Sequence, residues 1–512
     1  MKILDCTLRD GGYYTNWDFE SAVVETYIRN LNALPVDYIE LGYRNKPKTE
    51  YLGQFGYCPV STLKHIRTLS EKKLAIMLNE KDCRSEDLDL LLAPIQGIVD
   101  MVRMAVDPKN FERAIVLANA VRAMGFEVAF NTMYMSTWSS LKDFYPKLSQ
   151  LNEVANLFCM VDSFGSMTPE SVKETIQEVR QHTDVTLGFH GHNNLQLALI
   201  NSLTALEQGA EFVDATILGM GRGAGNLNME LLLTYLNKHK NLYVDFNKLG
   251  DVIQAFEPLL QQYNWGTNLP YMLSGANSIP QKEVMEMVCN RVYSFNSIVR
   301  NLQNRTNNGA VEKRYPIKRF KNAENVIIVG GGKSPIEHLN GIKSFISSLS
   351  SVVIVFATAR HAAYFESIDK PKYFCLSGKE GKRLSDVLDL NKFKGECIVG
   401  PYPQRFGTEV PEICAECTYE LRAYDFATDS PDSCTAISIQ AALEIQAKNV
   451  YVIGYDGYPG KMLSERDMAL NKENESLFRS YRSVAGKKLI SLTPTAYDEL
   501  DVQSIYQMIS NN

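Results

Sequence analysis

The sequence has no long hydrophobic run, no excess of basic residues and no paired zinc motif. No apolar stretch approaches the ~20 residues that a membrane-spanning helix needs, so we expect no membrane partner. A formal net charge of −6 and a pI near 5.8 give no reason to expect a nucleic-acid partner. The chain starts directly with a strand-like run, which predicts no signal peptide and a cytoplasmic location.

The ten cysteines are scattered through the chain, and only Cys414 and Cys417 form a C-x-x-C pair. No second pair completes a zinc site, so we expect reduced thiols. Internal repeats, low-complexity tracts and coiled-coil patterns are also missing. A composition of 45% hydrophobic and 22% charged residues is normal for a globular protein. A length of 512 residues predicts two or more domains.

Short apolar runs alternate with amphipathic helical runs over residues 1–240. Eight strand-then-helix units predict a parallel sheet covered by helices, and eight strands close a (β/α)8 TIM barrel. A doubly wound open sheet is the competing interpretation. Helical patterns include Phe19–Leu31, Phe111–Met124 and Pro169–Gln181. The predicted strands are Ile3–Leu8, Tyr38–Gly42, Leu74–Leu78, Met101–Val106, Val128–Thr132, Leu157–Val161, Thr186–Phe189 and Phe212–Ile217.

Polar residues cluster where the predicted strands end, which is where a barrel places its active site. His190 and His192 share one face of a strand because side chains alternate with period two. Such a pair can bind one divalent metal, and a hydrogen-bonded structural pair is the alternative. The other polar strand ends carry Arg9, Asp10, Glu40, Arg103, Asn131, Asp162 and the glycine loop Gly219–Asn226.

Three motifs carry a family resemblance: Thr-Leu-Arg-Asp-Gly, His-Gly-His-Asn-Asn and Gly-x-Gly-x-Gly-Ala-Gly-Asn, after strands one, seven and eight. They resemble the DRE-TIM metallolyases, the HMG-CoA lyase-like superfamily. This superfamily includes isopropylmalate and citramalate synthases, 4-hydroxy-2-oxovalerate aldolases and pyruvate carboxyltransferase domains. The resemblance covers roughly residues 1–300. It implies a divalent cation, Mn²⁺, Mg²⁺ or Zn²⁺, bound by Asp10, His190 and His192, with Asn226 as a further ligand.

The resemblance also implies that a C–C bond is made or broken beside an enolate. The metal would take the oxygens of a 2-oxo acid, and Arg9 would stabilise the developing charge. Because Gly223–Asn226 resembles the aldolase loop, we predict an aldolase that cleaves a 4-hydroxy-2-oxo acid into a pyruvate-type enolate and an aldehyde, or forms the acid from them. Two alternatives stay open. One is an acetyl-CoA-dependent synthase, and the other is a binding or regulatory protein whose barrel has lost its catalytic activity. Expected substrate-binding residues are Arg103, Asn131, Asp162, Gly221 and Gly223.

One departure from the aldolases concerns the acid/base group. The aldolases carry a histidine shortly after Arg-Asp-Gly, whereas this chain has Gly12-Tyr13-Tyr14. The other barrel histidines fall in helical runs, so Tyr13 and Glu40 are the preferred catalytic residues beside Arg9. A simple pairing of Glu40 with Arg9 or Arg103 is the alternative. The departure predicts a larger, sugar-like hydroxy-oxo acid as substrate.

The second half divides into post-barrel helices (241–304), a linker (305–325) and a Rossmann-like α/β domain (326–512). A glycine turn after its first strand could hold a phosphate at a helix N-terminus, and a tight turn is the alternative. Two short motifs here resemble sialyltransferase-type folds, which implies ligand binding by Gly330, Gly331, Gly332, Ser334 and Asp456. A docking or oligomerisation domain is the alternative, and we expect a homo-oligomer.

Overall fold

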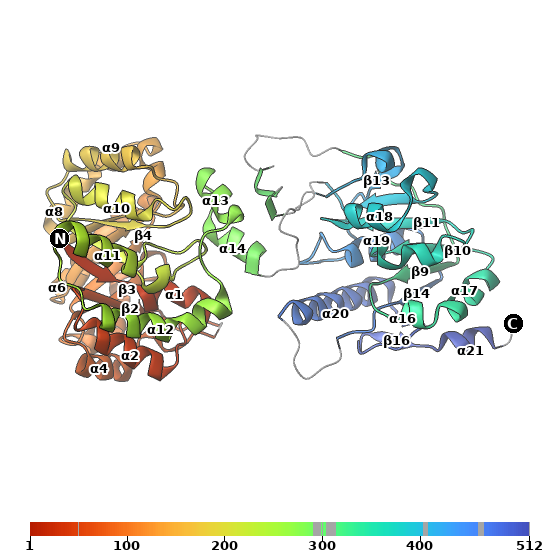
Figure 1. Cartoon of the computed structure of the whole chain (residues 1–512), viewed down its shortest axis with the longest axis horizontal. Helices are drawn as coiled ribbons and strands as arrows, with labels where there is room; N and C mark the ends of the chain where they lie inside the picture. Colours follow the sequence, from red (N-terminus) through yellow and green to blue (C-terminus); the bar gives the residue numbers. More distant parts are fainter. Residues whose placement is uncertain are drawn as a thin grey trace. The chain divides into compact units, whose positions relative to one another are not determined.

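The computed structural model describes residues 1–49, 51–289, 298–299, 301–303, 314–402, 408–458 and 465–510. The chain divides into two compact units, Met1–Met285 and Glu286–Asn512 (Figure 1). Residues 305–313 of the predicted linker lie outside the described residues. None of the described helices has both the length and the apolar character needed to cross a membrane.

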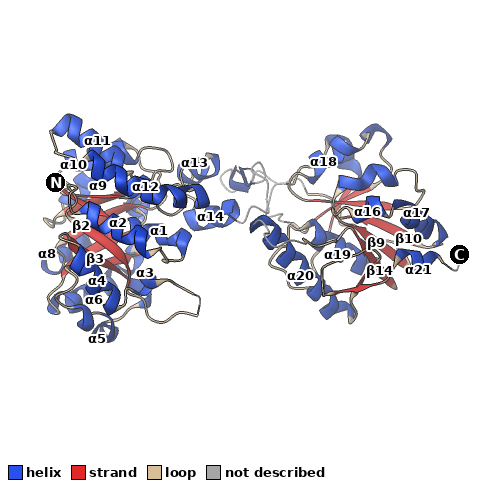
Figure 2. Ribbon diagram, turned by 60° about the horizontal axis from the view of Figure 1, so that its bottom comes forward, coloured by secondary structure: helices blue, strands red, loops and turns tan. Residues whose placement is uncertain are grey.

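The first unit contains a closed barrel of parallel strands in sequence order, which confirms the predicted (β/α)8 fold. Figure 2 shows these strands enclosed by helices. Strand β1 pairs with β2 and with β8, so the first and last strands close the sheet. The strands are β1 (Lys2–Asp5), β2 (Tyr38–Tyr43), β3 (Lys73–Asn79), β4 (Met101–Val106), β5 (Glu127–Thr132), β6 (Leu157–Asp162), β7 (Leu187–Gly191) and β8 (Phe212–Ala215).

Some helices of this unit are capped by the side chain of the residue before them. The Thr168 hydroxyl accepts a hydrogen bond from Ser171 N, and Pro169 occupies the first turn of α9. The Asp245 carboxylate caps α12 in the same way. The longer helices are α1 (Thr7–Thr15), α2 (Ser21–Leu31), α4 (Val60–Leu69), α6 (Phe111–Ala123), α9 (Pro169–Arg180), α10 (Ala198–Glu207), α11 (Met229–Lys240), α12 (Phe246–Tyr263), α13 (Leu269–Ala276) and α14 (Gln281–Cys289).

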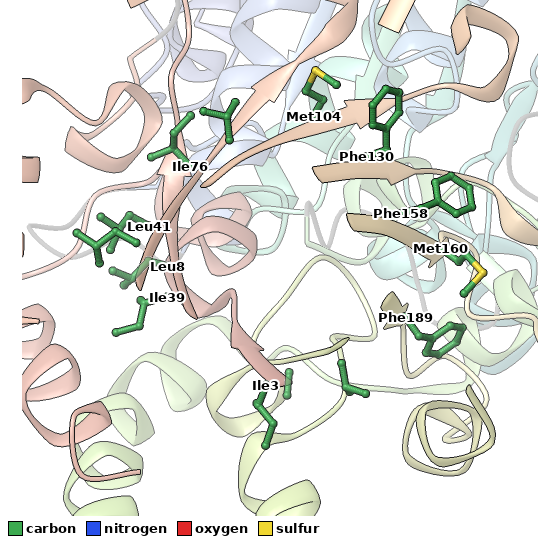
Figure 3. Packing of buried hydrophobic residues seen from close by; sticks show 14 of the residues in the cluster. Ile3, Leu8, Ile39, Leu41, Ile76, Met104, Phe130, Phe158, Met160 and Phe189 are labelled. Carbon is green, nitrogen blue, oxygen red and sulfur yellow. The ribbon is translucent and has the colours of Figure 1, made fainter. Parts of the chain in front are cut away.

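Strand alternation separates two sets of buried side chains. Outward-facing residues such as Ile39 and Phe130 pack in the large apolar core between sheet and helices (Figure 3). Inward-facing Tyr38, Met101 and Phe212 belong to a small apolar cluster inside the barrel. Two residues further along the same strands, the inward positions carry Glu40, Arg103 and Asp214, all buried. The barrel interior therefore changes from apolar to charged towards the carboxyl ends of its strands.

The first strand ends earlier than predicted. β1 stops at Asp5, and Thr7–Thr15 form α1, whereas the sequence predicted a strand over Ile3–Leu8. Thr7 N donates to Asp5 Oδ1 (2.8 Å), and Asp10 N donates to Cys6 O (2.9 Å), so the helix starts at once. A Cβ on Gly12 would lie 2.1 Å from the Trp17 ring, which explains a glycine inside this helix.

The second unit is an open α/β sheet with parallel pairings, which confirms the predicted second α/β domain. Within the described part of the chain its strand order is β13-β12-β11-β10-β9-β14-β15-β16. The order reverses between β9 and β14, and open α/β sheets bind ligands at such a switch point. The strands are β9 (Asn325–Val329), β10 (Val352–Phe356), β11 (Lys372–Leu376), β12 (Glu396–Val399), β13 (Thr418–Glu420), β14 (Asn449–Ile453), β15 (Leu489–Ser491) and β16 (Leu500–Val502).

Helices cover this sheet on both faces, as in Figure 1. The helices are α16 (Ser334–Glu337), α17 (Leu339–Ser348), α18 (Glu380–Val387), α19 (Cys434–Glu444), α20 (Glu465–Ala485) and α21 (Ile505–Ile509). Two separate apolar clusters lie in the unit, one including Val326 and Ile437 and the other including Ile327 and Ile342. Neighbouring residues of β9 thus point to opposite faces, which is the pattern of a central strand.

Candidate active site

Three predicted metal ligands lie together at the carboxyl end of the barrel. Asp10 comes from the first turn of α1, His190 from β7, and His192 directly follows β7. One ligand atom of each residue lies within 4.8 Å of the others. His190 Nδ1 lies 2.9 Å from Asp214 Oδ2, and His192 Nδ1 lies 2.8 Å from Asp162 O. If each Nδ1 donates, each Nε2 keeps a lone pair for a metal.

Asn226 lies beside this triad and has an unsatisfied oxygen. It pairs with His192 through an isolated β-bridge, and its Nδ2 donates to Asp10 Oδ2 (2.6 Å). Its buried Oδ1 has no hydrogen-bond partner among the described residues. A buried unsatisfied oxygen needs an explanation, and here it stands next to a carboxylate and two imidazoles. This donor set fits a divalent cation that accepts mixed oxygen and nitrogen ligation.

Arg9 and Arg103 connect the triad to a buried carboxylate. Arg9 Nη1 lies 2.6 Å from Asp10 Oδ1, and Arg9 Nε lies 3.0 Å from Glu40 Oε2. The same Glu40 oxygen lies 3.0 Å from Arg103 Nη1. The side chains of Glu40 and Arg103 have 0% exposure. Glu40 therefore lies between two guanidinium groups, which is the pairing weighed from the sequence.

Further contacts of Arg103 and His190 link these residues into a closed ring. Arg103 Nη2 lies 2.5 Å from Asp214 Oδ2, which also contacts His190. His190 Nε2 then lies 3.5 Å from Asp10 Oδ2. We call this closed set the charge ring. Its six members are Arg9, Asp10, Glu40, Arg103, Asp214 and His190, and it sets three carboxylates against two guanidinium groups.

The charge ring shifts the pKa values of the metal-ligand candidates. Burial would lower the pKa of His190, but hydrogen bonds to Asp10 and Asp214 outweigh it and raise that pKa. Burial, and then repulsion by His190, lowers the pKa of His192 to about 3. Burial would raise the pKa of Asp10, but Arg9 and the histidines hold it well below its usual value. At neutral pH, Asp10 and His192 are therefore in the protonation states that bind a metal.

Three buried residues that were predicted to bind substrate support this arrangement: Arg103, Asn131 and Asp162. Arg103 Nε donates to Asn131 Oδ1 (2.9 Å), so the predicted substrate contacts Arg103 and Asn131 bond each other. Asp162 accepts hydrogen bonds from Ser166 N and Met167 N, while its carbonyl orients His192. Burial raises the pKa of Asp162 to about 6. These contacts favour positioning roles over direct substrate contact.

The glycine loop after β8 is held by a post-barrel helix. A Cβ on Gly221 would lie 2.4 Å from Asn226 Nδ2, so a side chain there would displace Asn226. Gly223 has a φ of +64°, and its Cβ would lie 2.2 Å from Gln281 Oε1. Gln281, at the start of α14, accepts from Ala224 N (3.2 Å). Close packing inside the protein therefore accounts for both glycines.

An aromatic and cationic group stands next to the charge ring. The Tyr13 and Tyr43 hydroxyls lie 3.0 Å apart, and the Arg222 guanidinium lies 3.7 Å from the centre of the Tyr13 ring. Burial, and then Tyr13, raises the pKa of Tyr43 well above its usual value. Buried Arg222 Nε has no hydrogen-bond partner among the described residues. Tyr13 thus has a hydroxyl partner and a nearby cation, as an acid/base candidate needs.

Sequence reasoning missed three residues of this site. Asp214 lies in the apolar run Phe212–Ala215, and an acidic residue two positions after inward-facing Phe212 was a usable signal. Arg222 stood inside the glycine motif but was not singled out. Gln281 follows the barrel by many residues and left no signal in the motifs.

The predicted ligand residues of the second unit have a different setting. Asp456 Oδ2 accepts from Lys333 N (2.7 Å) and Ser334 N (3.0 Å), and Ser334 Oγ donates to Asp456 Oδ1 (2.5 Å). The carboxylate thus takes the backbone amides that a phosphate at this turn would use. The glycines Gly330, Gly331 and Gly332, together with Asp456, line a cavity of about 840 Å³.

The comparisons with known proteins concern mainly the barrel. The HMGL-like family model matches residues 1–255. The 4-hydroxy-2-oxovalerate aldolase 2 of Salinispora arenicola is 32% identical over 268 residues, covering 51% of this chain and 75% of that protein. The oxaloacetate decarboxylase of Mycobacterium tuberculosis is 27% identical over 256 residues, covering 49% of this chain and 75% of that protein.

One solved structure is much more similar in sequence. The N-terminal domain of a candidate aldolase from Bacteroides vulgatus is 65% identical, with a TM-score of 0.56. The match covers 59% of this chain and 99% of that one. The sialyltransferase-type resemblance of the second unit stays a prediction. Together with the barrel and its three motifs, these matches establish that the chain belongs to the HMGL-like family.

Proposed function

We propose that the barrel is a divalent-metal-dependent C–C lyase of aldolase type. It would cleave or form a 4-hydroxy-2-oxo acid through an enolate of the pyruvate type. The observation that carries the proposal is the grouping of Asp10, His190 and His192 within 4.8 Å, with Arg9 in contact with Asp10. Held there, Mn²⁺ or Mg²⁺, with Zn²⁺ as the alternative, would act as a Lewis acid on the oxygens of the 2-oxo acid.

Arg9 is the proposed electrostatic partner of the enolate oxygen. Its Nη1 contacts Asp10 and its Nε contacts Glu40, and no partner among the described residues is found for Nη2. Two fixed bonds hold the guanidinium plane before substrate arrives, which is the preorganisation that stabilises developing charge. Glu40 acts through Arg9 and is therefore a positioning residue in this proposal.

Tyr13 is the proposed proton acceptor. In the cleavage direction the Tyr13 phenolate would take the proton of the C4 hydroxyl. The C3–C4 bond then breaks, the electron pair of that bond passes to the enolate, and an aldehyde forms. Because its pKa is raised, Tyr43 stays protonated and can donate to the Tyr13 oxygen. Arg222 places positive charge 3.7 Å from the Tyr13 ring centre. These contacts support a role that a histidine fills in related aldolases.

The unpartnered Nε of Arg222 supports a substrate whose second half is polar. A small aldehyde with an alkyl tail would leave this buried donor unsatisfied, which costs free energy. A sugar-like or carboxylate-bearing aldehyde would satisfy it. The proposed reactants are therefore a 2-oxo acid and a hydroxyl-rich or anionic aldehyde.

The cytoplasmic location, the homo-oligomer and the domain bounds 1–240, 241–304, 305–325 and 326–512 also stay predictions.

Oxaloacetate decarboxylation is a second candidate reaction, favoured by the Mycobacterium tuberculosis relative. It would release CO₂ instead of an aldehyde and leave the same pyruvate enolate. The charge ring and Arg9 would serve both reactions equally. The two candidates therefore differ only in the group that leaves, and one measurement on pyruvate addresses their shared step.

The test is hydrogen exchange at the methyl group of pyruvate in D₂O, followed by NMR with and without Mn²⁺. We expect metal-dependent exchange that Arg9→Ala lowers by about 10²–10³-fold. Arg29→Ala, with a side chain 61% exposed on α2, is the matched control and should exchange normally. Aldehydes and oxaloacetate are then compared as substrates.

Failure of this test has a defined meaning. No exchange with Mn²⁺, Mg²⁺ or Zn²⁺ would overturn the pyruvate enolate and the aldolase with it. Thiol release from acetyl-CoA with a panel of 2-oxo acids would then support the synthase. Silence in both assays, with no metal bound, would favour the non-catalytic alternative.

A further inference from the structure

We propose that the second unit binds a phosphorylated sugar, either a nucleotide or a sugar phosphate, in the cavity at the switch point of its sheet. The cavity of about 840 Å³ falls within the size range of small-molecule sites. The loops after β9, β10, β11 and β14 line it, as do the start of α19 and the middle of α20. This location is where open α/β sheets place their ligands.

Basic side chains from the segments that follow three neighbouring strands form one wall of the cavity. Lys333 follows β9, Arg360 follows β10, and Lys379 and Arg383 follow β11. Arg360 Nη1 donates to Gly331 O (2.9 Å), which fixes its guanidinium group at the cavity. Arg383 is held by Thr358 Oγ1 (3.1 Å) and by an ion pair with Glu380. Cations gathered at strand ends and open to solvent are suited to an anionic group such as phosphate.

Polar groups that can bind hydroxyls line the side of α20 and β15. Glu473 and Asn474 belong to α20, and Tyr497 follows β15. Asn474 Nδ2 donates to Tyr497 OH (2.9 Å), and Asn474 Oδ1 accepts from Thr435 Oγ1 (3.2 Å). In dinucleotide-binding folds an acidic side chain near the switch point binds a ribose hydroxyl, and Glu473 is the acidic residue of this wall. This wall therefore suits the sugar part of the ligand.

The backbone amides at the start of α16 are not the phosphate site in this proposal. Asp456 already accepts from Lys333 N and Ser334 N, and a second anion there would be repelled. The phosphate would instead lie near the side chains of Lys333, Lys379 and Arg360. A ligand with a phosphate at one end and hydroxyls at the other matches the two walls. Neither inorganic phosphate nor an unphosphorylated nucleoside satisfies both.

The experiment is calorimetric titration of the full chain with AMP, CMP, UMP and glucose 1-phosphate. The matched nucleosides, glucose and inorganic phosphate are titrated in parallel. We expect at least one phosphorylated sugar to bind at least tenfold more tightly than its unphosphorylated form and than phosphate. A preference for nucleotides or for glucose 1-phosphate decides which source the ligand has. No binding by any member of the panel overturns the proposal, as does equal affinity for phosphate alone.

Variants locate the binding in the cavity. Lys333→Gln with Lys379→Gln should weaken binding by roughly tenfold, because each lysine is an exposed cation worth up to about fivefold. Lys392→Gln, a cation that is 84% exposed and does not line the cavity, should bind normally. Glu473→Gln should weaken the binding of the phosphorylated sugar without changing the affinity for inorganic phosphate. Unchanged affinity in the double lysine variant would overturn the site. Pyruvate exchange, measured on the same samples, reports the barrel separately.

Discussion

The barrel site and the cavity of the second unit both lie at the carboxyl ends of parallel strands, yet they hold charge differently. In the barrel, Arg103 has a side chain with 0% exposure and contacts two carboxylates. In the second unit, Arg383 is 43% exposed and pairs with one neighbour on its own helix. A closed sheet directs many strand ends at one centre, so its charges are buried and must satisfy one another. An open sheet has one switch point, and its cations keep contact with water.

The largest effect should come from removing a residue that belongs to both the triad and the charge ring. His190→Ala should abolish stoichiometric Mn²⁺ binding and pyruvate exchange. The loss should exceed the ~10–100-fold that removal of an outer partner of a metal ligand causes. Metal analysis after dialysis measures it, and His182→Ala, in the turn after α9, is the control. A variant that retains one metal per chain would contradict the assigned ligand set.

The contrast between closed and open sheets predicts different costs for removing an arginine. Arg103→Met removes one of the two buried cations of the ring and leaves Glu40 with Arg9 alone and Asp214 with His190 alone. This loss should lower the free energy of unfolding by about 3–5 kcal/mol. Arg383→Met removes a half-exposed pair and should change it by less than about 1 kcal/mol. Urea unfolding of both variants tests the comparison. Equal costs would show that closure of the sheet does not determine the energetics.

A variant at Asp214 separates the orientation of His190 from the direct ligation of the metal. Asp214→Asn keeps the shape of the side chain but weakens its hold on His190 Nδ1 and on Arg103. Metal affinity should fall by about 10–100-fold while the overall fold is retained. Mn²⁺ titration with circular dichroism as the folding check measures this. Affinity equal to that of the unmodified chain would remove Asp214 from the metal site.

The smallest of these effects concerns pH and salt. The pKa of His190 is raised, and only the unprotonated Nε2 can ligate, so Mn²⁺ affinity should fall as pH decreases through that pKa. Below it, each pH unit should cost about tenfold for one displaced proton. Mn²⁺ affinity independent of pH between 5 and 8 would contradict the role of His190.

Added salt should barely alter metal binding in the barrel but should weaken ligand binding in the second unit, because exposed charges are screened.

The barrel could be predicted from the sequence because its strands are short, largely apolar runs that recur at regular intervals. Met101–Val106 matches the observed strand at both ends. β13, β15 and β16 were not predicted, since three residues are too few to show a period. The end of β1 was misplaced because Thr7 and Leu8 fit a strand equally well. The Asp5 side chain decides the outcome through a hydrogen bond to Thr7 N, which a pattern does not show.

The site was predictable where motifs name the residues and not where packing brings them together. Asp10, His190 and His192 stand in recognisable motifs, and the structure places their ligand atoms within 4.8 Å. Glu40 and Arg103 are 63 residues apart, and their contact depends on which inward positions share a level of the barrel. Arg222 occupies a variable position of the glycine motif, and only the structure shows its unsatisfied Nε and its contact with the Tyr13 ring.

The charge ring also constrains how the barrel folds. Its members come from α1, β2, β4, β7 and β8, so the helix that follows the first strand and the last strand both contribute. A chain that stops before β8 lacks Asp214, and Arg103 and His190 would have to remain hydrated. Without that carboxylate, Arg103 Nη2 and His190 Nδ1 lose their buried acceptor, which disfavours stable, partly assembled intermediates. Closure of β8 onto β1 brings the last carboxylate into place, and assembly of the barrel becomes cooperative from its first residues to its last.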